Sequence, residues 1–107
     1  MLEKKGVRCV VVPKNNDGLD LHAVLTAIGE DGMHHVWIEA GATCFNAFLK
    51  QNVLNQAILY ISKNTLGDDA FSADVDVDFI KKNAVQYQCG DDWVIDRSFL
   101  CCKISTN

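Results

Sequence analysis

Apolar residues in the first part of the chain follow two alternating patterns, one typical of strands and the other of helices. Three short apolar runs predict strands at residues 7–12, where Pro13 stops the strand, and at 34–40 and 57–61, where the pattern is that of buried strands. Between the first two runs, apolar residues recur at the spacing of one helical face: Leu21, Val24, Leu25 and Ile28. A second helical face follows the second run, formed by Phe45, Phe48 and Leu49. The order strand, helix, strand, helix, strand predicts an α/β fold.

Polar residues and glycines mark where these elements begin and end. Residues 15–18 (Asn-Asn-Asp-Gly) predict a turn after the first strand. Asp20 is placed to cap the N-terminus of the first helix, and Gly32 to follow its last turn. In the second helix, the Thr43 hydroxyl is placed to cap the first turn, and residues 50–52 end the helix.

Strands that alternate with helices in this way predict a parallel βαβαβ unit with right-handed crossovers and with helices over the sheet. The last third of the chain has a different pattern. Alternating apolar residues at 75–79 and 85–89, a turn at 90–92 and an apolar stretch at 93–104 predict a C-terminal antiparallel hairpin. Residues 63–73 have no periodicity, which predicts a surface loop with a role of its own.

Composition narrows the class of protein. The chain has 107 residues, 49% hydrophobic and 22% charged, which predicts a single globular domain over residues 1–107. The net charge of −4, without a basic stripe, argues against a nucleic-acid partner. Apolar runs far below the ~18 residues of a membrane span, and first residues unlike a signal peptide, favour a cytoplasmic protein without membrane contact. The five cysteines lack metal-ligand spacing, so we expect reduced thiols and no metal site.

The candidate site lies where the second predicted strand meets the second helix. Glu39 ends the strand, at the edge of the sheet where open α/β sheets bind ligands. Gly41 lets a ligand approach the backbone, and the free N–H groups of the following helix attract phosphate. The same pattern also fits an ordinary turn with a solvated carboxylate, since the glycine spacing matches no nucleotide-binding fingerprint. Both interpretations stay open on the residues alone.

Several stretches agree in order and spacing with one family. They are residues 20–25, 29–32, 36–43 and 47–49, and the agreement continues through 59–61 and 66–70. Over this part of the chain, from about Val7 to Ala70, the sequence resembles the reductase domain of the bifunctional riboflavin-biosynthesis deaminase/reductase. Beyond Ala70 only the turn at 90–92 and the hairpin pattern are similar.

The resemblance implies a dihydrofolate-reductase-like fold and an oxidoreductase. NADPH would reduce 5-amino-6-(5-phosphoribosylamino)uracil to the ribitylamino product of riboflavin biosynthesis. By position, Glu39 matches an acid that contacts the substrate. The NADPH-binding loop of the family falls on Gly41, Ala42, Thr43, Cys44, Phe45, Asn46 and Ala47. No residue is assigned as a catalytic acid or base, because the hydride is the cofactor's own chemistry.

The chain also departs from the family. Ala40 stands in place of the first of two glycines, and Lys63-Asn64 replaces a Pro-Lys pair. The chain is shorter than the family's reductase domain and resembles its second half, without the zinc deaminase domain. We therefore expect it to form a homo-oligomer or to assemble with a missing half-domain. The alternatives are a non-catalytic module that self-associates and a binder of another phosphorylated metabolite.

Overall fold

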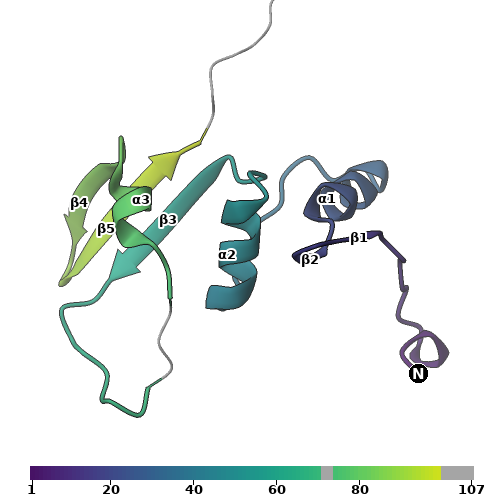
Figure 1. Ribbon diagram of the computed structural model, residues 1–107, viewed down its shortest axis with the longest axis horizontal. Coiled ribbons are helices and arrows are strands. Elements are labelled where there is room, and N and C mark those ends of the chain that lie inside the picture. The colour runs from purple at the N-terminus through teal and green to yellow at the C-terminus, as the bar shows by residue number, and fades with distance from the viewer. Residues whose placement is uncertain (71–73, 100–107) are drawn as a thin grey trace, which may run out of the picture.

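The computed structural model describes residues 1–70 and 74–99, which form three helices, one short 3-10 helix and five strands (Figure 1). In chain order the elements are η1 (Glu3–Lys5), β1 (Lys14–Asn15), β2 (Gly18–Leu19), α1 (Leu21–Glu30), α2 (Ala42–Lys50), β3 (Gln56–Ile61), α3 (Val77–Lys81), β4 (Val85–Cys89) and β5 (Asp92–Ser98). Helices and strands both contribute, so the α/β class is confirmed. In Figure 1, α2 lies between the three-stranded sheet and α1.

The main sheet has three antiparallel strands in the order β3-β5-β4. β4 and β5 form the predicted hairpin, with Gly90 at a φ of 61° in the turn between them. β3 confirms the third predicted strand and pairs with the other edge of β5, from Gln56 opposite Ser98 to Ile61 opposite Trp93. The last strand in the chain order is thus the central one.

The core lies where α3 packs on this sheet. Its most deeply buried side chains are Ile80 of α3 with Val94 and Ile95 of β5. The Arg97 guanidinium lies 4.6 Å and 4.5 Å from the ring centroids of Phe79 and Phe99, and it also donates to the Phe79 carbonyl oxygen. The sheet is therefore held to α3 by apolar burial together with one cation stacked on two rings.

The N-terminal elements follow the predicted capping pattern. The turn at 15–18 joins β1 to β2, and Gly18 has a φ of 117° that only glycine adopts readily. Asp20 caps α1 by accepting from the Ala23 N–H at 3.2 Å, and Gly32 follows the helix at a φ of 88°. Each of these local predictions is confirmed, because caps and turns depend on neighbouring residues alone.

Gln51, just after α2, joins α2 to the N-terminal elements. Its Oε1 accepts from the Leu21 N–H at 2.9 Å and from Asn15 Nδ2 at 3.2 Å. Its Nε2 donates to the Leu19 carbonyl oxygen at 3.1 Å. Beside it, Lys50 and Asp17 form an ion pair at 2.6 Å. One amide side chain thus connects the hairpin, the start of α1 and the end of α2.

Two of the strand predictions are wrong. Residues 7–12 and 34–40 are extended chain without a ladder partner among the described residues, and their apolar side chains are largely exposed, Val11 by 97%. A strand needs a neighbour that takes up its backbone hydrogen bonds, and here none lies alongside. The parallel βαβαβ unit is consequently not formed: every strand pair within the described ranges is antiparallel.

The alternation at 75–79 is the third misleading pattern, because its second half forms the start of helix α3 (Val77–Lys81) instead of a strand. Asp76 caps this helix by accepting from the Phe79 N–H at 2.9 Å, and Val77 and Ile80 are three residues apart on one face. A capping aspartate followed by that spacing outweighs the alternation. The apolar residues predicted at 100–104 lie outside the described residues, as do residues 71–73 of the predicted loop.

Candidate functional site

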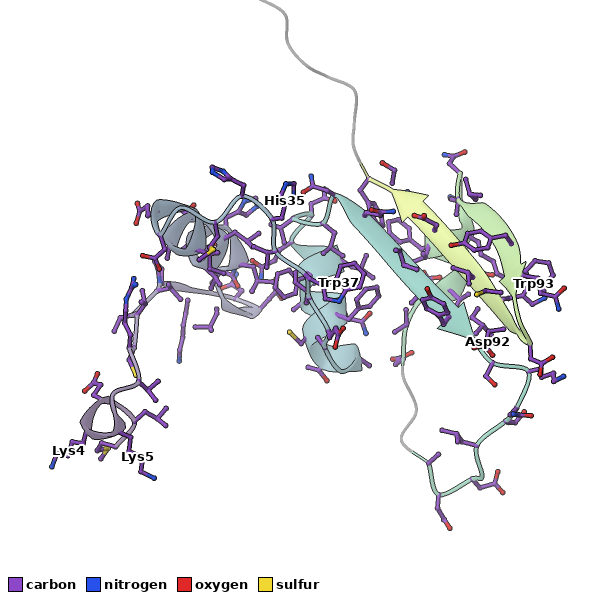
Figure 2. The ribbon with its side chains drawn as sticks, turned by 180° about the vertical axis from the view of Figure 1, so that it is seen from behind. Lys4, Lys5, His35, Trp37, Asp92 and Trp93 are labelled. Carbon is purple, nitrogen blue, oxygen red and sulfur yellow. The ribbon has the colours of Figure 1, made fainter. Side chains whose placement is uncertain are left out.

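The candidate site lies at the junction between the extended segment 34–41 and α2. Figure 2 shows Trp37 on this segment where it runs along α2. The segment ends at Gly41, the N-cap of α2, whose carbonyl oxygen accepts from the Phe45 N–H at 3.0 Å. Glu39 is exposed, and its Oε1 accepts from Trp37 Nε1 at 2.8 Å. The predicted acid and the predicted glycine turn therefore do lie together at the start of a helix.

The first turn of α2 is largely exposed. Gly41 has φ −66° and ψ 170°, and a Cβ placed on it would meet no atom within 4 Å. Thr43 and Cys44 are exposed, and Ala42 is half-buried. The capping role predicted for the Thr43 hydroxyl is wrong, since no side chain caps α2. The N–H groups of this turn are consequently available to an anion.

The remaining predicted residues are less exposed than Gly41, Thr43 and Cys44. Phe45, Asn46 and Ala47 are half-buried on α2. Asn46 Nδ2 donates to the carbonyl oxygen of Asp74 at 2.6 Å, which ties α2 to the segment before α3. The structure thus divides the predicted loop into an accessible end, Gly41 to Cys44, and a packed end, Phe45 to Ala47.

A groove of about 540 Å³ lies beside this junction. It is bounded by residues 33–38, by Leu25 of α1, by Phe45 of α2 and by residues 53–58 at the start of β3. Most of its lining is apolar, with His34, His35, Asn55 and Gln56 as the polar exceptions. The groove therefore lies between the segment 34–41 and the start of β3.

Sequence reasoning missed Trp37 as part of the site, because it placed this side chain in the core. The side chain is 74% exposed and bonds to the predicted substrate acid. The signal was present in the spacing, since residues i and i+2 of an extended chain share one face.

The described residues give no sign of a metal centre or a membrane segment. Among residues 1–70 and 74–99, His, Cys, Asp and Glu side chains do not form a group of three that could hold a metal ion. Three cysteines in this part of the chain, Cys9, Cys44 and Cys89, are free and exposed. In the same residues no helix is long and apolar enough to cross a membrane.

Comparison with known proteins agrees with the resemblance. The family model described as the RibD C-terminal domain matches residues 2–95. Riboflavin biosynthesis protein RibD of Escherichia coli (strain K12) is 33% identical over 64 residues, which are 60% of this chain and 17% of that protein. The 5-amino-6-(5-phosphoribosylamino)uracil reductase of Buchnera aphidicola is 26% identical over 66 residues, 62% of this chain and 32% of that protein.

The chain therefore matches less than a third of the length of either relative. The family model, in contrast, covers most of the chain, from the first 3-10 helix into β5. The match includes the Glu39 to Cys44 junction and the groove beside it. On this basis the chain belongs to the family of RibD C-terminal domains.

Proposed function

We propose that this chain carries the NADPH-binding part of a reductase that converts 5-amino-6-(5-phosphoribosylamino)uracil to the ribitylamino product. The observation that carries the proposal is the accessible junction Glu39 to Cys44 in a chain of the RibD C-terminal domain family. The name of the Buchnera relative supports the substrate. Together, the junction and the family support an oxidoreductase of riboflavin biosynthesis.

The first turn of α2 fits a phosphate of NADPH. Open space at Gly41 leaves room for the group, and Thr43 and Cys44 are exposed residues whose N–H groups lie in the first turn of α2, at the positive end of the helix dipole. Ala42 is the first residue of this turn. The next residues, Phe45, Asn46 and Ala47, are half-buried, and the Asn46 side chain holds α2 to the segment before α3. The bound nicotinamide supplies the hydride, and the chain's own residues bind and orient.

Glu39 is proposed to contact the substrate. Its ionised carboxylate only accepts hydrogen bonds, and the pyrimidinedione N–H groups and ribose hydroxyls of the substrate are donors. The side chain is exposed at the end of the segment that leads into the cofactor turn. One short stretch of chain would thus bring substrate and cofactor together, and proximity of this kind is the main contribution of the protein to hydride transfer.

Gly41→Val should weaken NADPH binding at least tenfold while leaving the fold intact. The backbone of Gly41 lies in a region that any residue adopts, and its Cβ direction is empty, so valine causes no clash or backbone strain. Its stability cost is that of a poorer N-cap residue, about 1 kcal/mol, which leaves the chain folded. The valine methyl groups would instead occupy the space proposed for the phosphate. Calorimetric titration of the chain with NADPH measures the difference, and far-UV circular dichroism checks the fold.

Gly67→Val is the matched control, because Gly67 lies in an exposed loop with equally open space at its Cβ position. This variant should bind NADPH like the unmodified chain. Equal NADPH affinity of the Gly41→Val variant and the unmodified chain would contradict the proposed phosphate site. Retention of phosphorylated ligands that lack nicotinamide, with no preference for NADPH, would favour a binder of another phosphorylated metabolite.

A second candidate function is assembly, with a second copy or with the other half of a reductase domain. It is favoured by the outer edge of β3, which has no strand partner among residues 1–70 and 74–99. Phe99 N–H donates to the Asn55 carbonyl oxygen at 2.8 Å, and the pairing continues in register from there. In such a ladder the backbone groups of Ala57, Leu59 and Ile61 face β5, so those of Ile58 and Tyr60 face outward. We propose that this edge accepts another strand, which would complete the sheet beside the groove.

Tyr60→Pro tests this assembly. Proline removes the outward N–H and should be tolerated at an edge position, so the chain should fold but lose the capacity to add a strand. Sedimentation velocity should show the unmodified chain as an oligomer and the variant as a monomer. A strictly monomeric unmodified chain would remove self-association and leave a separate half-domain as the partner.

A further inference from the structure

Burial does not explain the position of the Trp37 side chain. Its side chain is 74% exposed, although tryptophan is usually placed where most of its surface is covered. Trp37 lines the groove together with Ile38 and Phe45. Its polar atom is used: Nε1 donates to Glu39 Oε1 at 2.8 Å. The feature that defines this residue is therefore its contact with the carboxylate of Glu39.

That contact restricts Glu39. A glutamate side chain in water changes freely among rotamers, and ordering it on binding costs free energy. The Trp37 donor, two residues earlier in the chain, occupies one carboxylate oxygen before any ligand arrives. The indole N–H is only a donor and the carboxylate only an acceptor, so this hydrogen bond can run only from Trp37 to Glu39.

We propose that Trp37 is a positioning residue that orients the Glu39 carboxylate for the substrate. The indole N–H takes Oε1, and Oε2 is left for an N–H or O–H donor of the ligand. This inference rests on the proposed function, because it takes Glu39 as the substrate contact. It adds a residue that acts through Glu39 without touching the reacting atoms.

The contact itself is tested by the indole N–H resonances of the ¹⁵N-labelled chain. The chain contains two tryptophans, and Trp37→Phe identifies which signal belongs to Trp37. Glu39→Ala should shift the Trp37 signal and leave that of Trp93 in place, since Figure 2 places Trp93 on the sheet, well apart from Trp37. An unchanged Trp37 signal would overturn the proposal.

The role is tested by a double-mutant cycle with 5-amino-6-(5-phosphoribosylamino)uracil in calorimetric titrations of the chain. Trp37→Phe should weaken binding about three- to tenfold, the range expected for one hydrogen bond. In the Glu39→Ala background the same substitution should have no further effect, because Trp37 then has nothing to orient. Trp93→Phe is the matched control for losing an exposed indole, since Trp93 is 53% exposed, and should bind unchanged.

The outcomes separate the two proposals. If Trp37→Phe weakens binding equally in both backgrounds, Trp37 contacts the ligand directly and the positioning role is overturned. If Glu39→Ala weakens binding and Trp37→Phe does not, the positioning role fails while Glu39 keeps its function. If the unmodified chain does not bind the pyrimidine, the proposed function fails, and the role of Trp37 falls with it.

Discussion

Ile80→Ala is expected to lower the free energy of unfolding by about 2–5 kcal/mol, the range for truncating a fully buried aliphatic side chain. Ile80 is 0% exposed and is the one buried residue within α3. It is buried in a helix that packs against β5, so alanine would leave a cavity between the helix and the sheet. Urea unfolding followed by circular dichroism measures the change.

Leu66→Ala is the matched control, because it also removes an aliphatic side chain but from a position that is 78% exposed. Its unfolding free energy should stay within about 0.5 kcal/mol of the unmodified chain. If the two variants lost equal stability, α3 would not be anchored to the sheet by Ile80.

Gln51→Ala is expected to lower the free energy of unfolding by about 1–3 kcal/mol. The substitution removes three hydrogen bonds at once and leaves the Leu21 N–H without its acceptor. That N–H belongs to the first turn of α1, where intrahelical partners are missing. The loss should also appear locally, as faster hydrogen exchange of the Leu21 amide.

Two further variants make this prediction specific. Gln51→Glu keeps the acceptor for the Leu21 N–H but no longer donates to the Leu19 carbonyl oxygen. Its free energy of unfolding should therefore lie between those of the unmodified chain and of Gln51→Ala. Gln86→Ala changes the same residue type at an exposed position of β4 and should have little effect. Unchanged Leu21 exchange in Gln51→Ala would show that Gln51 does not hold the start of α1.

Local signals in the sequence predicted most of the local structure, with the Thr43 cap of α2 as the exception. The caps at Asp20 and Gly32, the turn at 15–18 and the β4–β5 hairpin depend on residues a few positions apart, and all are present. The two strands predicted from apolar runs alone are not, because strand formation depends on a partner that no local pattern specifies. The apolar runs at 7–12 and 34–40 indicate burial, and the described residues do not provide it.

In the candidate site, too, local features were predicted correctly and the orientation of side chains was not. The position of Glu39 and Gly41 at a helix start followed from their order in the chain, and the structure brings them together. The orientation of Glu39 did not follow, since it depends on the direction of the Trp37 side chain. Burial of Trp37 was predicted from the apolar run around it, and that prediction is wrong in this structure.

The central place of β5 has a consequence for synthesis on the ribosome. β5 is the last described element to be made, yet both β3 and β4 take their hydrogen bonds from it. Until Asp92 and the residues after it have left the ribosome, the apolar segment of β3 therefore has no strand to pair with in the nascent chain. A stop codon shortly before Asp92 would accordingly remove the whole sheet instead of one strand, and would release a product prone to aggregate.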